Sequence, residues 1–162
     1  MRHIRPAPLT ADAFAPYGEV LSATGAYRLI NDGMCRRHHD LARLDFGAGR
    51  AGISIFQAQP RTLPCSLDLL ERHPLGSQAF VPMGAQPFLV VVAPGPDATP
   101  LAFITDGAQA INLRRGTWHG VLTPLHAPGL FAVIDRIAPD GEAPGANLVE
   151  HRLPAPFLIT PP

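Results

Sequence analysis

Residues 71–83 read ERHPLGSQAFVPM, and they place an acid, an imidazole and an amide at the border of two strand-like segments. Successive side chains of an extended strand point to opposite faces, so Glu71 and His73 share one face of the first segment. The Pro-Leu-Gly run that follows ends that strand and favours a short turn. The second segment begins at Gln78, whose amide can approach the first two side chains from across the turn. We expect these three side chains to belong to one site.

A second polar segment lies further along the chain, where residues 114–120 read RRGTWHG. Gly116 permits a tight turn, and Trp118 and His119 come directly after it. Imidazole and carboxylate groups are the usual ligands of borderline divalent metals, and an amide oxygen is a weaker donor. The two segments together are typical of a two-part metal site. The predicted metal ligands are Glu71, His73, Gln78 and His119.

The distribution of glycine and proline indicates an all-β chain. The two residue types number 34 (15 plus 19) of 162, yet they alternate with apolar segments that a disordered chain would lack. Strand-like segments recur about every 8 to 12 residues, which is the spacing of sandwiches and barrels. We therefore predict a jelly-roll barrel in a single domain over residues 1–162. One short helix is expected at 10–15, with Thr10 as its N-cap.

The expected strands are bounded mainly by glycine, proline, aspartate or asparagine. The C-terminal stretch LPAPFLITPP is rich in proline, has little pairing capacity and is expected to pack as an extended arm. Two resting places stay open for this arm, namely its own barrel and a neighbouring subunit. The expected strands are 27–31, 41–46, 52–58, 66–73, 78–82, 87–93, 101–105, 110–113, 118–122, 130–136 and 148–153.

Charge and composition exclude several classes of function. The formal net charge is +0, so no basic field attracts phosphate backbones, and we expect no nucleic-acid partner. All 13 basic residues are arginine, which excludes Schiff-base chemistry on a lysine side chain. Cys35 and Cys65 lack the spacing of a zinc site and are expected to be reduced. The N-terminus has no secretory pattern, and the longest apolar run, 88–93, is far shorter than the roughly 20 residues that span a bilayer. We expect a cytoplasmic protein that does not bind membranes.

Several segments, in one order, resemble the ureidoglycolate lyase family of the cupin superfamily. The segment ERHPLGSQAFVPMG at 71–84 resembles a variant of the first cupin motif, and Gly116 with His119 resembles the core of the second. The resemblance covers nearly the whole chain and implies a cupin-like double-stranded β-helix (jelly-roll) barrel. The other matching segments are NDG at 31–33, HHDL at 38–41, AQP at 58–60, AFITDG at 102–107 and IDR at 134–136.

This resemblance implies an enzyme that cleaves (S)-ureidoglycolate to glyoxylate and urea in allantoin degradation. It also implies a homodimer and a divalent metal cofactor, which in this family is associated with nickel. The substrate carries a hydroxyl and a ureido nitrogen on one carbon, so loss of the hydroxyl proton yields an aldehyde and expels urea. A metal would lower the pKa of that hydroxyl, and a histidine or Glu71 would take its proton. The expected catalytic residues are Glu71, His73 and His119.

Three candidates for substrate binding have a structural alternative. Asn31 lies in an Asn-Asp-Gly turn that is ordinary loop chemistry, and the resemblance alone makes it a candidate. Gln78 either reaches the site or ties the turn together. Trp118 either forms the wall of a pocket or belongs to the core.

Arginine suits the substrate carboxylate because its guanidinium binds in a bidentate manner. Arg72 is a candidate only if a bulge turns it toward the site, since strand alternation points it away from Glu71. Arg136, Arg114 and Arg115 are further candidates, and the sequence does not choose among them. The predicted substrate-binding residues are Asn31, Arg72, Gln78, Trp118 and Arg136.

Two other readings of the sequence remain open. The first is a non-catalytic cupin that binds a small organic acid, for instance as a sensor. The second is a metal-dependent cupin oxygenase or isomerase, because cupins perform both reactions. Turnover of ureidoglycolate separates the first reading from the lyase, and oxygen consumption separates the second.

Overall fold

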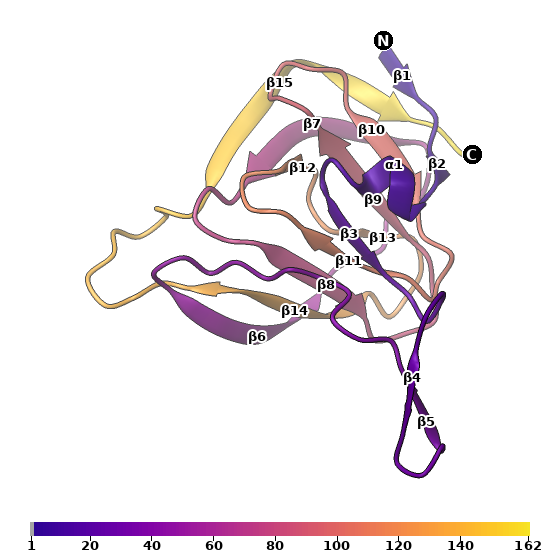
Figure 1. The fold of residues 1–162 in the computed structure, drawn as a ribbon. Helices are drawn as coiled ribbons and strands as arrows, with labels where there is room; N and C mark the ends of the chain where they lie inside the picture. The colour runs from indigo at the N-terminus through magenta and orange to yellow at the C-terminus, as the bar shows by residue number, and fades with distance from the viewer. Residues whose placement is uncertain (1) are drawn as a thin grey trace.

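Two facing β-sheets form the body of the protein in a computed structural model that describes residues 2–162 (Figure 1). The larger sheet has eight strands in the order β1-β15-β7-β12-β9-β10-β2, with β13 paired to β9 beside this path. Its strands are β1 (Arg2–Ile4), β2 (Ala7–Pro8), β7 (Cys65–Arg72), β9 (Phe88–Ala93), β10 (Leu101–Ile104), β12 (Trp118–His119), β13 (Thr123–Pro124) and β15 (Val149–Ile159).

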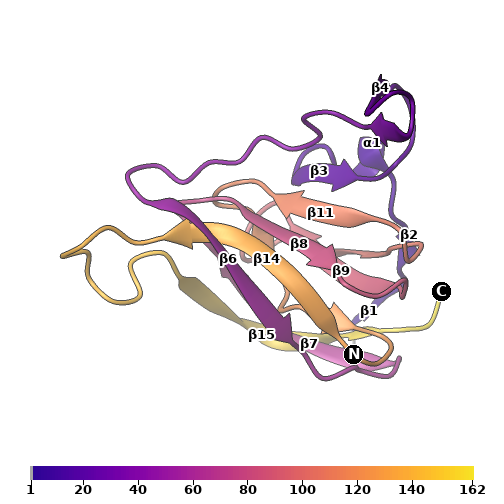
Figure 2. The same cartoon turned by 90° about the horizontal axis from the view of Figure 1, so that it is seen from below.

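The second sheet has five strands in the order β3-β11-β8-β14-β6, and Figure 2 shows them side by side. All of its neighbouring strands are antiparallel. The central strand β8 joins the pair β3-β11 to the long pair β14-β6, which leaves β6 as an edge strand. The strands are β3 (Gly18–Leu21), β6 (Arg50–Gln57), β8 (Gln78–Pro82), β11 (Ala110–Leu113) and β14 (Leu130–Ile137).

Strand β9 is buried along its whole length because it separates two apolar cores. Its even-numbered residues, Phe88, Val90 and Val92, join a cluster that also contains Phe80 and Val133 of the five-stranded sheet. That cluster therefore fills the space between the two sheets. The odd-numbered residues of β9 join a second cluster whose members all come from the eight-stranded sheet, which curls over itself to enclose them.

The N-terminal helix prediction is confirmed. Helix α1 (Ala11–Phe14) begins after Thr10, whose side chain accepts a hydrogen bond from the backbone N–H of Ala13 at 3.2 Å. Phe14 is fully buried in the core between the sheets, so this short helix closes one end of that core. Within residues 2–162 no helix is long and apolar enough to cross a membrane.

The strand predictions are confirmed for β8 and β11 to the residue, and most others differ by one to three residues at an end. The expected strand at 41–46 is wrong, because that segment crosses the outer face of the five-stranded sheet without pairing to a strand. Its backbone carbonyls are satisfied in another way. Asn112 donates its side-chain amide to the carbonyl of Arg43, and the N–H of Ser77 bonds to the carbonyl of Asp45.

The C-terminal arm rests on its own sheet, which decides between the two places left open by the sequence. Strand β15 pairs with β7 on one side and, in parallel, with β1 on the other. The register with β7 shifts between Arg152 and Phe157, across the two prolines that cannot donate to the ladder. Phe157 and Ile159 are 2% and 1% exposed in the second core.

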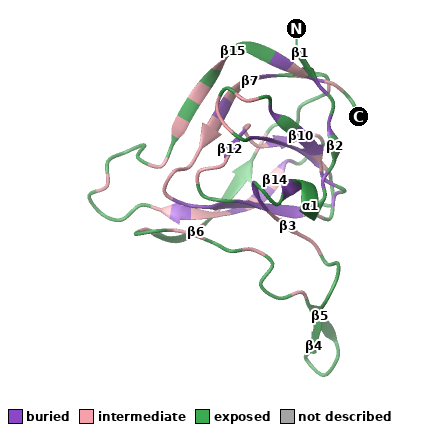
Figure 3. Ribbon diagram, turned by 45° about the horizontal axis from the view of Figure 1, so that its top comes forward, coloured by how far each residue is buried: buried purple, intermediate pink, exposed green. Residues whose placement is uncertain are grey.

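A third element, the hairpin of β4 (Arg28–Ile30) and β5 (Cys35–Arg37), projects from the body of the protein (Figure 1). Its strands pair only with each other. Every residue of the hairpin is exposed, as Figure 3 shows in green. The turn at its tip contains Asn31 and Asp32 with φ of 54° each, a conformation that asparagine and aspartate tolerate better than most residues.

We predict that Phe157→Ala destabilises the isolated chain by about 3–5 kcal/mol, because it empties a fully enclosed aromatic position. Urea unfolding followed by circular dichroism at several protein concentrations measures the effect. Leu101→Ala, at a position that is 45% exposed, is the matched control and should change stability little. A loss of stability that depends on protein concentration would instead place the arm in a contact between subunits.

Candidate functional site

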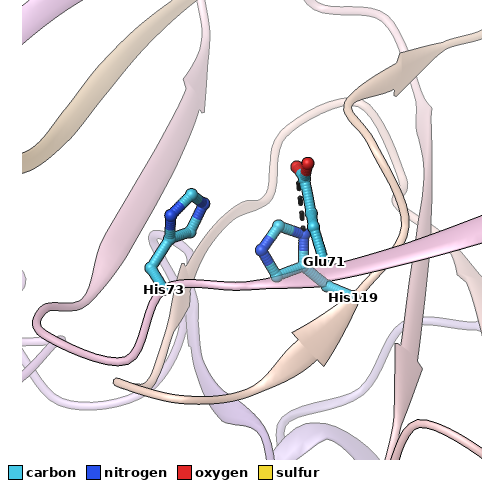
Figure 4. Close-up of side chains that lie close together, drawn as sticks. All are labelled: Glu71, His73 and His119. Carbon is cyan, nitrogen blue, oxygen red and sulfur yellow. Dashed lines mark ion pairs between the residues drawn. The ribbon is translucent and has the colours of Figure 1, made fainter. Parts of the chain in front are cut away.

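Glu71, His73 and His119 meet between the two sheets (Figure 4). Each offers one ligand atom, and these three atoms lie within 4.8 Å of one another. The register of the eight-stranded sheet produces this cluster, because Glu71 of β7 lies directly opposite His119 of β12. His73 follows two residues after Glu71, at the end of β7, on the face predicted from strand alternation.

The turn before β12 fixes the position of His119. Gly116 adopts a φ of 79°, a left-handed conformation that glycine reaches without steric cost. Its N–H donates to the carbonyl of His73 at 2.9 Å, so the two site segments are joined through their backbones. The prediction that Gly116 makes a tight turn is confirmed.

Both imidazoles are anchored through Nδ1. The Nδ1 of His73 lies 2.8 Å from the carbonyl oxygen of Asn147, and the Nδ1 of His119 lies 2.9 Å from that of Gly120. A carbonyl oxygen only accepts, so each Nδ1 carries the proton and each Nε2 keeps its lone pair. Both Nε2 atoms are buried, and neither has a hydrogen-bond partner among residues 2–162.

Gln78 approaches the same interior from the opposite sheet. Gln78 lies two residues before Phe80 on β8, so the two side chains share a face of the strand. Phe80 belongs to the core between the sheets. Its side-chain Nε2 donates to Oδ2 of Asp135 on β14 at 3.1 Å. The side-chain oxygen, Oε1, is buried and finds no partner within the described part of the chain.

Trp118 and Arg72 lie on the other face of the eight-stranded sheet. Trp118 is 9% exposed and belongs to the second apolar core. Of the two alternatives for this residue, a pocket wall or a core position, the structure shows the core position. The guanidinium carbon of Arg72 lies 4.9 Å from the centre of the Trp118 ring, which is a cation–π contact. Arg72 thus points away from Glu71, as strand alternation indicates, and the structure does not bring these two residues to the cluster.

The remaining substrate-binding candidates also lie apart from the cluster. Asn31 is exposed at the tip of the β4-β5 hairpin. Arg136 is buried, but its guanidinium donates to both carboxylate oxygens of Glu142 and to the carbonyl of Phe46. Arg114 and Arg115 are exposed, and Arg115 donates to the carbonyl of Pro74 at 2.7 Å. No arginine clamp at the cluster is present in the geometry of residues 2–162.

Comparison with known proteins gives a consistent result. The family described as ureidoglycolate lyase matches residues 1–160. The ureidoglycolate lyase of Rhodobacter capsulatus is 59% identical over 94% of both chains, and that of Chelativorans sp. is 47% identical over 98% of this chain and 97% of its own. Ureidoglycolate lyase 2 of Rhizobium meliloti is 42% identical over 94% of both. The chain belongs to the ureidoglycolate lyase family.

The site of this ureidoglycolate lyase family member suits a divalent metal. The Nε2 atoms of His73 and His119 are buried acceptors that lack a partner in the described residues, and the Glu71 carboxylate belongs to the same cluster. The Oε1 of Gln78, on the opposite sheet, is a further buried acceptor without a partner in residues 2–162. Nitrogen and oxygen donors of this kind hold borderline divalent cations. The Nδ1 hydrogen bonds to backbone carbonyls are also the usual support of metal-binding histidines.

Burial controls the charge of these groups. The pKa of His119 is lowered to about 4, chiefly by burial; the hydrogen bond to Gly120 opposes this effect, and the neighbouring His73 adds to it. His119 is therefore neutral near pH 7, with a free lone pair. Burial raises the pKa of the Glu71 carboxyl, and nearby Glu150 adds to this effect while His73 opposes it.

Two residues that support the site were not recognised in the sequence. Asp135 accepts a hydrogen bond from the amide of Gln78. Asn147 accepts from His73 through its backbone carbonyl and from the N–H of Leu75 through its side chain, at 2.8 Å each. The Ile-Asp-Arg run at 134–136, which resembles the ureidoglycolate lyase family, could have marked Asp135 as a candidate. No local pattern marks Asn147, which ends a long surface loop.

We predict that the metal-free protein gains stability as pH rises from about 4 to about 6.5. In that window the unfolded chain binds a proton at His119 that the folded chain excludes, so the free energy of unfolding increases with pH. The contribution of His119 is on the order of 3 kcal/mol. Urea unfolding at several pH values, with chelator present, measures it. His119→Gln should reduce the rise of the unfolding free energy with pH, and an unchanged rise would contradict the assignment of this effect to His119. His3→Gln is the control, because His3 is exposed on β1.

Proposed function

We propose that this protein cleaves (S)-ureidoglycolate to glyoxylate and urea. The observation that carries the proposal is the convergence of Glu71, His73 and His119 in a chain that belongs to the ureidoglycolate lyase family over its whole length. The reaction is an elimination in which the C–N bond breaks, the C–O bond becomes a carbonyl, and one proton moves from the hydroxyl oxygen to the leaving nitrogen. Neither water nor oxygen is consumed.

The residues that would hold a divalent metal, which we propose to be nickel, are Glu71, His73, His119 and Gln78. Such a cation polarises the hydroxyl and carboxylate oxygens of a bound substrate. The Nδ1 atoms of both imidazoles lie at hydrogen-bond distance from backbone carbonyls, which leaves Nε2 as the atom that would bind a cation. Glu71 is the acidic residue of this ligand set, glutamine is uncharged, and burial keeps the imidazole of His119 neutral near pH 7.

Glu71 is the residue best suited to move the proton. Burial raises the pKa of this carboxyl in the metal-free protein. With one oxygen on the cation, the carboxylate would keep a second oxygen that can accept a proton. In the proposed sequence Glu71 accepts the hydroxyl proton and returns it to the ureido nitrogen as urea leaves. The same carboxyl thus acts as base and then as acid, and the net proton count is zero.

We predict equimolar urea and glyoxylate from purified protein and ureidoglycolate, with no oxygen uptake and with loss of activity in chelator. Ammonia in place of urea would indicate a different reaction on the same substrate. Oxygen uptake would favour the oxygenase reading. Binding of the substrate without any product would favour a non-catalytic cupin.

We predict that His119→Ala lowers turnover by more than the 10- to 100-fold expected for loss of a residue that only supports a ligand. The reason is that it removes a donor atom from the cluster itself. Metal content and kcat, measured on folded protein, test this, and excess nickel or manganese should restore part of the activity. His3→Ala is the matched control. A folded His119→Ala protein with normal turnover and metal content would remove His119 from the site.

We further infer that the two facing sheets are a cupin-type jelly roll in one domain. The support is that two largely antiparallel sheets face each other across the core that contains Phe80, Val92 and Val133, with parallel pairing only at β1-β15 and β10-β2. The chain segments that resemble the two cupin motifs, 71–84 and 116–119, also meet at the cluster.

A homodimer is proposed as the working form, with the outer face of the five-stranded sheet as its interface. Val133 is fully buried toward the core and lies opposite Ser54, so the flanking Ile53 and Ile55 of β6 point outward. They are 75% and 58% exposed. Met34, in the turn of the β4-β5 hairpin, is a further apolar side chain that is 86% exposed. Apolar exposure on this scale is typical of contact surfaces between subunits.

We predict that Ile53→Asp weakens the dimer at least about tenfold, because association would bury an unpaired charge. Analytical ultracentrifugation over a range of concentrations measures the dissociation constant. Leu148→Asp, at an exposed position in a loop, is the control and should leave the dimer intact. A monomeric wild-type protein, or an unaffected Ile53→Asp variant, would contradict this interface.

A further inference from the structure

Asp135 is the one carboxylate that touches Gln78 in the described structure, and its position is set by the strand pair. Asp135 of β14 lies opposite Gln78 of β8 in the register of the five-stranded sheet. Asp135 lies two residues after Val133 and shares its face of the strand, so its side chain points toward the space between the sheets. The amide nitrogen of Gln78 donates to its Oδ2 at 3.1 Å.

This contact decides which end of the amide faces the site. A glutamine side chain carries an oxygen and an NH2 group on the same carbon, and a half turn exchanges them. A carboxylate oxygen attracts the NH2 group and repels the amide oxygen, so Asp135 favours one of the two orientations. In that orientation Oε1 is a buried acceptor with no partner in residues 2–162, as are the Nε2 atoms of His73 and His119.

We propose that Asp135 is a positioning residue that holds the Gln78 amide with Oε1 directed to the Glu71–His73–His119 cluster, where it serves as an oxygen ligand for a divalent cation. The inference rests on the metal site of the proposed function and adds a residue to its support. Without Asp135, the amide is free to turn and to present NH2, which a cation does not bind. Gln78 is 6% exposed, so water cannot readily replace the missing acceptor.

The test is the binding of Ni²⁺ and of Mn²⁺ to metal-free protein by calorimetry, in five single variants and the wild type. Asp135→Ala removes the acceptor, and Asp135→Leu removes it while filling the space, in case the alanine variant does not fold. Asp135→Asn keeps an acceptor oxygen of the same shape. Gln78→Ala removes the ligand itself. Asp68→Ala removes an exposed carboxylate of β7 and is the control.

We expect Asp135→Ala or Asp135→Leu to weaken binding of both cations about 10-fold or more, the scale of lost support for a ligand. Asp135→Asn should bind within about threefold of the wild type, a small cost for retaining the acceptor oxygen. In a Gln78→Ala background the loss of Asp135 should have no further effect. Exchange of the Gln78 side-chain NH2 protons with water, followed by nuclear magnetic resonance, should be slow in the wild type and faster without Asp135.

Two results would overturn the positioning role alone. These are unchanged cation binding in Asp135→Ala and Asp135→Leu, and an equal loss of binding when Gln78 is already alanine, which would indicate a general effect on fold or charge. A wild-type protein that binds neither cation would overturn the metal site, and the role of Asp135 with it. Turnover of ureidoglycolate by the same preparation shows separately whether the proposed reaction stands.

Discussion

Glu71 and His119 lie opposite each other in the pairing of β7 with β12, and the rest of the site follows from this register. Strand β12 has only two residues, so a slip of one residue would exchange His119 for Trp118 on the inner face. Two contacts hold the register. The turn at Gly116 is bonded to the backbone of His73, and Arg72 packs on the Trp118 ring from the other side of the sheet. The pairs Glu71–His119 on the inner face and Arg72–Trp118 on the outer face thus connect the same two strands.

The cluster is also a place where the fold accepts an energetic cost. A buried polar group without a hydrogen bond destabilises a protein by about 1–3 kcal/mol, and the cluster holds two such acceptors, the Nε2 atoms of His73 and His119, with the Glu71 carboxylate beside them. The protein has reduced that cost by keeping His119 neutral and by satisfying Nδ1 of both imidazoles with backbone carbonyls. What remains is a set of lone pairs that a ligand would satisfy.

The sequence predicted the features that depend on local geometry. Strand alternation placed Glu71 and His73 together, and the capping chemistry of Thr10 marked the helix. The sequence did not predict the contacts that segments far apart in the chain make with each other. The backbone of 41–46 is satisfied by side chains of other strands, and Arg136 is occupied by Glu142 from a loop. Neither contact has a signature in the local sequence, because both depend on how the two sheets are closed.

Asn147, at the end of the surface loop before β15, is the residue of this segment that contacts the site. It accepts from His73 through its carbonyl and from Leu75 through its side chain, so one residue holds both sides of the turn between β7 and β8. The loop residues that precede it, 138–146, carry no such duty toward the cluster. Apart from Glu142, which pairs with the buried Arg136, this loop should therefore tolerate insertions, deletions and changes of composition as related proteins diverge, up to the boundary at Asn147. The hydrogen bond that holds Nδ1 of His73 would then set a limit on how far a solvent-facing loop can diverge.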